Sequence, residues 1–297
     1  MSIFSGLELF GVKTEEKKDI FKNDDSEMKK RKELEEKAAK EREKNKQVFK
    51  EEKDYLLQKE IGCPVCQKKF KTLVVRDAKL RRKEPDYDLR PRFMHIDTLK
   101  YDVVSCPYCG YTALSRYFSG LTKGQIMLVK ENISKDFRMQ DDVLPETYDY
   151  ATAIMRTKLA LYNAVVKRGK TSERAYACLK ARWLYRDYIE QKKNDGETDF
   201  IELDNMKSEM LEFSKEAYEG LQQAMVQEPF PICGMDQNTL EYLLACLGLE
   251  LKDYTHAARF LSDVITSKSS DKRLKDRALD VKDKLLAEVN EAKKSKI

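Results

Sequence analysis

The sequence predicts a mainly α-helical fold in which a small β-rich module with paired cysteines precedes an array of helices. Three observations favour this fold class. Gly and Pro are scarce, at 11 and 7 of 297 residues, which argues against an all-β protein. Apolar residues recur at helical spacing through most of the chain after residue 122. Two Cys-x-x-Cys pairs lie before that point, next to strand-like segments.

The first sixty residues are expected to lie outside the main core. Residues 1–12 carry a short apolar stripe of Ile3, Phe4, Leu7 and Phe10, which either folds back on the main body or binds elsewhere. Residues 13–60 hold 16 basic and 15 acidic side chains and no Pro or Gly. This composition predicts a charged helical or disordered spacer. A coiled coil is the competing interpretation, but the apolar residues do not sustain a heptad repeat.

Residues 61–121 have the pattern of a small β-rich domain. Segments 68–76 and 100–105 are strand-like, and each adjoins a cysteine pair. Segment 84–92 contains two prolines and is expected to form a loop. The positive charge of the chain is concentrated in this region, where residues 61–125 hold 13 basic and 6 acidic side chains.

The two cysteine pairs point to one structural metal site. Cys63-Pro-Val-Cys66 and Cys106-Pro-Tyr-Cys109 each offer two thiolates from a tight turn, and four thiolates bind Zn²⁺ tetrahedrally at about 2.3 Å. Gly110 suits the left-handed turn that follows such a pair. The 39 residues between the pairs exceed the usual spacing, so a long loop must lie between the strands. The prediction is one structural Zn²⁺ in a zinc-ribbon-like domain.

Redox catalysis is the alternative for these cysteines, because Cys-Pro-Tyr-Cys is the glutaredoxin active-site tetrapeptide. That chemistry needs the first cysteine at a helix N-terminus in a βαβ unit, whereas here a strand precedes the pair. His95 is a further candidate that would replace one cysteine ligand, although a single loop histidine is more often exposed. Cys178, Cys233 and Cys246 have apolar neighbours and are expected to be small buried hydrophobic residues.

Residues 122–291 are expected to form the helical domain, followed by a tail over 292–297. Ser172, Asp204 and Asn238 are candidate N-caps, the last with Glu241 in a capping box. The apolar spacing predicts a first helix around 126–137 and further helices at 148–168, 172–193, 204–228, 237–251, 254–267 and 271–291.

Residues 237–267 resemble one tetratricopeptide-type helix pair. Leu244 and Ala245 match the first helix, Ala257 and Leu261 match the second, and Gly248 falls where a large residue is usual. Fewer than three clear repeats indicate a short, capped array.

Together with CPVC, KTLVVRDAKLRR, KYDVVSCPYCGY and ARWLYR, this pattern resembles the bacterial family called domain of unknown function 2225 over most of residues 61–267. The resemblance implies a cytoplasmic bacterial protein with a zinc-ribbon-like head and tetratricopeptide-like helices. It implies no activity.

Composition and missing motifs narrow the function. No segment is apolar enough for a membrane span, and the N-terminus lacks the features of a signal peptide, so a cytoplasmic location is expected. The sequence contains no GxxxxGK[ST], GxGxxG, HExxH or GxSxG motif. Only His95 and His256 could serve a histidine-based mechanism. The protein is therefore expected not to be an enzyme, unless unassigned carboxylates act as acid and base. No small-molecule substrate can be identified.

The leading interpretation is an adaptor that binds another protein through its helices. Trp183, Tyr185 and Tyr188 are candidate anchors in a partner groove, although Trp183 also fits a core position. The alternative is binding of RNA or single-stranded nucleic acid through the basic head. Its candidate contacts are Lys79, Arg81, Arg82, Lys83, Arg90 and Arg92.

Overall fold

The structure is a computed structural model, and it describes residues 32–33, 51–139, 141, 143–196 and 199–294. The chain divides after Phe49, and the elements below belong to the second unit, residues 50–297. The apolar stripe expected in residues 1–12 and most of the expected spacer lie outside the described residues. The expected division into a domain of residues 61–121 and one of residues 122–291 remains a prediction.

Two antiparallel β-hairpins open the second unit. β1 (Leu56–Gly62) pairs with β2 (Lys69–Val75), and β3 (Val103–Ser105) pairs with β4 (Thr112–Leu114). Each hairpin turn contains one Cys-x-x-Cys pair. β1 begins inside the segment expected to be a spacer. Most of its side chains are exposed, so it lacks the apolar alternation by which a strand is recognised in a sequence.

Helices make up most of the remaining described chain, in positions close to those expected, which confirms the mainly α fold class. α2 (Lys123–Val129) continues as a π-helical turn over Lys130–Ser134. The other helices are α3 (Tyr150–Val166), α4 (Thr171–Asn194), α5 (Phe200–Gln227), α6 (Gln237–Glu250), α7 (Tyr254–Thr266) and α8 (Lys272–Lys294).

The helix starts differ in detail from those expected. Asp199 caps α5 and Asp236 caps α6, so the proposed caps Asp204 and Asn238 were wrong. Ser172 lies inside α4, where its hydroxyl donates to Glu228 Oε2 at 2.6 Å. Ser172 and Asn238 are the second residues of their helices and Asp204 is the fifth. They were mistaken for caps because they are of the residue types that caps favour.

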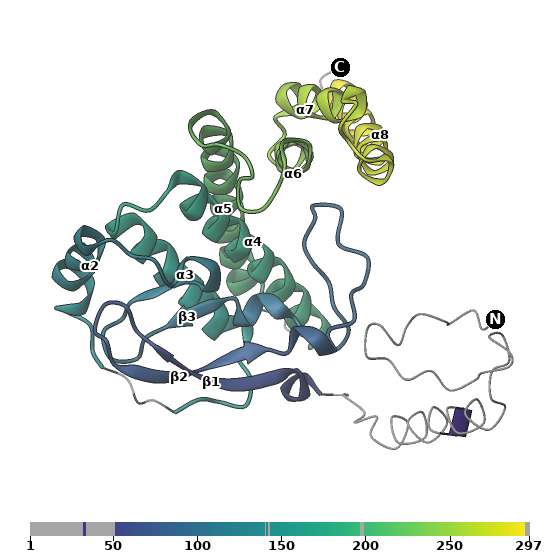
Figure 1. Cartoon of the computed structure of the whole chain (residues 1–297). Helices are drawn as coiled ribbons and strands as arrows, with labels where there is room; N and C mark the ends of the chain where they lie inside the picture. The colour runs from purple at the N-terminus through teal and green to yellow at the C-terminus, as the bar shows by residue number, and fades with distance from the viewer. Residues whose placement is uncertain (1–31, 34–50, 140, 142, 197–198, 295–297) are drawn as a thin grey trace, which may run out of the picture. The chain divides into compact units, whose positions relative to one another are not determined.

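The helices pack mainly on their sequence neighbours. α4 lies against α3 and α5, while α6, α7 and α8 form a second group (Figure 1). Gly248 allows α6 to approach α7 closely, since a Cβ there would lie 3.3 Å from the Cβ of Ala257. This fits the expected helix pair, although its tetratricopeptide character remains a prediction. Cys178 and Cys246 are buried in the helical core, and Cys233 is half-buried.

The long loop between β2 and β3 reaches from the hairpins to the C-terminal helices (Figure 1). Tyr242 of α6 donates a hydrogen bond to the carbonyl of Tyr87 at 2.6 Å. Arg273 and Arg277 of α8 form ion pairs with Glu84. The loop therefore connects the cysteine-bearing hairpins to helices more than 150 residues further along the chain.

Candidate metal centre

Each cysteine pair is held in a tight turn by the same backbone geometry. The amide of Gln67 donates to the carbonyl of Cys63 at 2.9 Å, and the amide of Gly110 donates to that of Cys106 at 3.1 Å. Gln67 and Gly110 each follow the second cysteine of a pair and have φ values of 62° and 73°. The left-handed turn expected at Gly110 is confirmed. In the first turn, Gln67 has the equivalent left-handed conformation.

The four thiols of Cys63, Cys66, Cys106 and Cys109 form one cluster, with all sulfur atoms within 4.8 Å of one another. The Sγ atoms of Cys63 and Cys109 are 3.6 Å apart, and those of Cys66 and Cys106 are 3.7 Å apart. A disulfide requires about 2.05 Å. Four sulfurs at about 2.3 Å from a tetrahedral metal would be separated by about 3.8 Å. The donor set therefore fits a metal ion that favours tetrahedral thiolate ligands, such as zinc or iron.

The charge state of the cluster explains why a cation would stabilise it. The pKa of Cys63 is raised, because the neighbouring thiol of Cys106 and burial both disfavour its thiolate. Four thiolates in this space would repel one another strongly. A bound divalent cation offsets that repulsion, and thiols that coordinate such a metal are deprotonated.

The cluster belongs to a hydrophobic core shared with α2 and α3. Val129 and Ile133, from α2 and the turn after it, are buried against the cysteines. Asn163 of α3 is fully buried and donates from Nδ2 to the carbonyl of Gly110 at 3.2 Å. The second turn is thus fixed to a helix by a hydrogen bond and by packing. Such support holds metal ligands in one geometry.

Gly110 offers a direct test of this packing. A Cβ at this position would lie 2.4 Å from the ring of Phe137, and the φ of 73° disfavours any L side chain. Gly110→Ala should therefore destabilise the protein by about 2 to 4 kcal/mol and weaken metal binding. Thermal melting and metal titration measure both effects. Gly62→Ala is the matched control, because a Cβ at Gly62, next to Cys63, meets no atom within 4 Å. Equal stability of the two variants would contradict this role of Gly110.

The two alternatives for the cysteine pairs lack structural support among the described residues. Cys106 follows β3 and precedes β4, so it does not lie at a helix N-terminus as redox catalysis would require. His95 is exposed, stacks on Tyr55 with a ring separation of 6.3 Å, and is not part of the cysteine cluster.

The aromatic residues expected in a partner groove occupy buried or half-buried positions. Trp183 is 3% exposed and donates from Nε1 to Asp88 at 2.8 Å, while Tyr185 is 5% exposed and donates to Glu209. Tyr188 is half-buried and stacks on Tyr150. Trp183 and Tyr185 were therefore wrong as groove anchors, because a partner cannot reach them in this packing.

The basic residues proposed to contact nucleic acid fall into two groups. The side chain of Arg90 is 1% exposed and bonds to Asp97 at 2.7 Å, and Arg92 bonds to Asp187 at 2.7 Å. Arg90 was wrong as a surface contact, since its side chain is buried. Arg92 is 33% exposed and is paired with carboxylates of the same chain, so its contact with nucleic acid stays a prediction. The exposed group comprises Lys79, Arg81, Arg82 and Lys83.

A buried ion-pair network was missed at the sequence level. Asp88 is fully buried and accepts hydrogen bonds from Arg182 Nη1 at 2.5 Å, Trp183 Nε1 at 2.8 Å and Arg186 Nη1 at 2.8 Å. Burial alone would raise the pKa of Asp88, but the two arginines outweigh it and hold that pKa below its ordinary value. The network fixes the long loop to α4. The available signal was the pair of acidic residues, Asp86 and Asp88, followed closely by the two basic residues Arg90 and Arg92.

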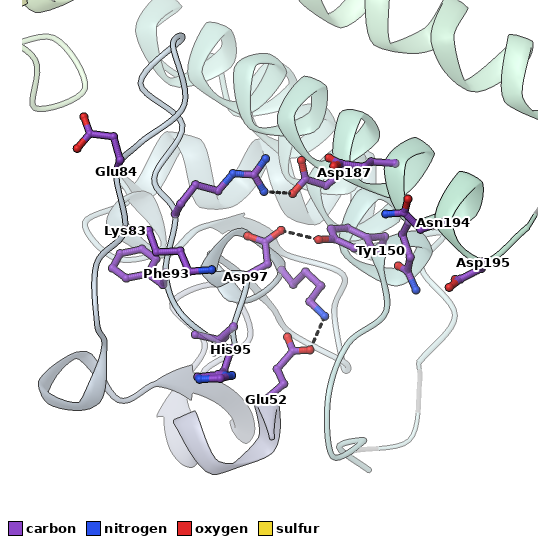
Figure 2. Close-up of a pocket in the computed structure, with 15 residues that line it drawn as sticks. Glu52, Lys83, Glu84, Phe93, His95, Asp97, Tyr150, Asp187, Asn194 and Asp195 are labelled. Atoms are coloured by element: carbon purple, nitrogen blue, oxygen red, sulfur yellow. Dashed lines mark hydrogen bonds and ion pairs between the residues drawn. The ribbon is translucent and has the colours of Figure 1, made fainter. Parts of the chain in front are cut away.

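A polar pocket of about 760 Å³ lies beside this network, between the long loop and the end of α4 (Figure 2). Its principal carboxylates already have partners within the chain. These pairs are Glu52 with Lys100 (2.7 Å), Asp97 with Tyr150 (3.0 Å) and Asp187 with Arg92 (2.7 Å). The interactions stabilise the loop against α3 and α4, which is a sufficient role for these carboxylates.

The fold and the cysteine cluster define a mainly α-helical protein with a candidate four-cysteine metal centre. Within the described residues, no helix has the length and apolarity to cross a membrane. The model of the family described as "Uncharacterized protein conserved in bacteria (DUF2225)" matches residues 56–285, and the chain belongs to this family. The expected family is thereby confirmed. No curated protein and no solved structure matches the chain.

Proposed function

We propose that the four cysteines bind one structural Zn²⁺ and that the protein is a non-enzymatic adaptor in the bacterial cytoplasm. The observation that carries the zinc assignment is the cluster of four sulfurs on two matching turns. Four thiolates fill a tetrahedral coordination sphere and leave no position for a catalytic water. The role of the ion is to join the two hairpins.

The adaptor role finds support in a groove of about 780 Å³ formed by α5, α6 and α7. Val226 is 84% exposed at its edge, and Met225 and Phe230 add apolar surface. Glu241, Arg259 and Asp263 supply polar groups beside them. Apolar side chains flanked by charges suit the binding of an amphipathic helix from a partner protein.

Co-purification from bacterial cells tests this role. The intact protein should retain a discrete partner after nuclease treatment, and Val226→Asp should reduce its recovery about tenfold or more, because an aspartate would be desolvated in the groove. Ile201→Asp is the matched control, since Ile201 is 75% exposed on the same helix and lies outside the groove. Equal recovery with both variants would contradict the adaptor proposal.

Nucleic-acid binding remains the second candidate, supported by the exposed group Lys79, Arg81, Arg82 and Lys83. The burial of Arg90 and the internal ion pairs of Arg92 reduce that support. The same purification separates the two functions. Nucleic acid that is sensitive to nuclease and to salt, and that Arg81→Glu/Arg82→Glu abolishes, would replace the adaptor proposal.

A further inference from the structure

A second cavity, here called the α3 groove, has the character of a small-molecule site. It has a volume of about 790 Å³, within the range of roughly 300 to 1,000 Å³ typical of ligand pockets. It lies between α3, the segment before it and the second cysteine turn. Its apolar wall includes Pro107, Phe137, Leu144, Tyr148, Met155 and Leu159.

Arg156 lines this groove together with Lys71 and Lys158, and its hydrogen-bond partners are incomplete. It donates from Nη2 to the carbonyl of Val103 at 2.8 Å, and its guanidinium lies 4.5 Å from the centre of the Tyr148 ring. Its Nε is buried and has no hydrogen-bond partner within the described chain. No carboxylate among the described residues forms an ion pair with it. Burial without such a partner lowers the pKa of Arg156.

Arg156 is half-buried, and the fully buried arginines Arg90 and Arg182 have different partners. Arg90 and Arg182 are each paired with carboxylates of the long loop. Withdrawing a cation from water without pairing it with an anion costs free energy. A second unsatisfied group, the buried hydroxyl of Thr72, also lines the groove. The groove therefore offers apolar surface together with donors that lack an acceptor.

We propose that the α3 groove binds a small organic acid, whose carboxylate pairs with Arg156 and whose apolar body covers Phe137, Leu144 and Met155. A carboxylate supplies both the missing acceptor and the missing negative charge. An alkyl or aromatic body removes the apolar wall from water. This site borders the second cysteine turn without including any of the four cysteines, and it is separate from the groove proposed for a protein partner.

Calorimetric titration of the intact, metal-loaded protein tests the proposal with two acids, decanoate and phenylbutyrate. At least one of the two acids should bind, with one molecule per chain. Tighter binding of decanoate would indicate a ligand with an aliphatic body, and tighter binding of phenylbutyrate one with an aromatic body. Phenylbutanol, which carries an uncharged hydroxyl group in place of the carboxylate of phenylbutyrate, should bind at least about tenfold more weakly, as expected for the loss of a charge-assisted hydrogen bond. Failure of both acids to bind, or equal binding of the alcohol and the acids, would overturn the proposal.

Two variants locate the site. Arg156→Met should weaken acid binding at least about tenfold. Arg174→Met is the matched control, because Arg174 also has an unpartnered buried Nε but lies on α4 outside the groove. Ala151→Trp should block the groove while retaining Arg156, which covers the case in which Arg156→Met does not fold. Unchanged binding in Ala151→Trp, or equal losses in the two arginine variants, would contradict the assignment.

Discussion

Replacing Cys106 by serine should release the metal and lower the melting temperature by roughly 10 °C or more. The cluster joins hairpins whose cysteines are 40 residues apart in the sequence, and it lies in the core shared with α2. Structural zinc contributes about 10 to 16 kcal/mol of apparent binding energy in small zinc-binding peptides. A loss of only about 3 to 5 kcal/mol in the free energy of unfolding is enough for this shift, because each kcal/mol lowers the melting temperature of a protein of this size by roughly 2 to 4 °C.

Cys178→Ala provides the control for this prediction. Cys178 is buried in the helical core, outside the four-cysteine cluster, so its variant should retain the metal and melt close to the unmodified protein. Melting followed by circular dichroism, with and without a chelator, measures the effect. If Cys106→Ser and the unmodified protein melt alike and respond alike to the chelator, the cluster does not stabilise the fold through a metal.

Asp88→Ala should be the second most damaging substitution, with a cost of about 3 to 5 kcal/mol. It would leave Arg182, whose side chain is 2% exposed, and Arg186 without their shared carboxylate. It would also release the long loop from α4. Denaturant unfolding gives the free energy, and limited trypsin digestion should show faster cleavage after Arg81 and Arg82 in the released loop.

Glu84→Ala is the comparison for Asp88→Ala. Glu84 belongs to the same loop and pairs with Arg273 and Arg277, but its side chain is 63% exposed. Exposed ion pairs contribute little, so this variant should be close to the unmodified protein in both measurements. Equal effects of the two substitutions would mean that the buried ion pairs of Asp88 contribute no more to stability than the exposed ion pairs of Glu84.

The sequence was sufficient to predict the features that rest on local pattern. Helix positions follow from apolar spacing, and the four-cysteine cluster follows from two pairs that each form a turn. β1 was missed because its side chains are mostly exposed. Arg90 was interpreted as a surface cation, because a residue type does not reveal whether a carboxylate will meet it in space. Its partners Asp97 and Asp187 lie on different segments of the fold.

The family match extends over most of the second unit. The matched segment begins at residue 56, the first residue of β1, and ends at residue 285, where Leu285 of α8 is buried in the helical core. It thus covers the hairpins, the loop and the helices that the loop contacts. The cysteine-bearing hairpins and the C-terminal helices therefore lie within one family segment.

Metal content is the most direct test of the central claim. The protein should be purified from bacterial cells without a metal-affinity step and analysed by inductively coupled plasma mass spectrometry. We expect one zinc per chain in the unmodified protein and in Cys178→Ala, and almost none in Cys63→Ser or Cys106→Ser. Folded protein that contains iron or no metal, or cysteine-cluster variants that keep their zinc, would contradict the structural zinc site.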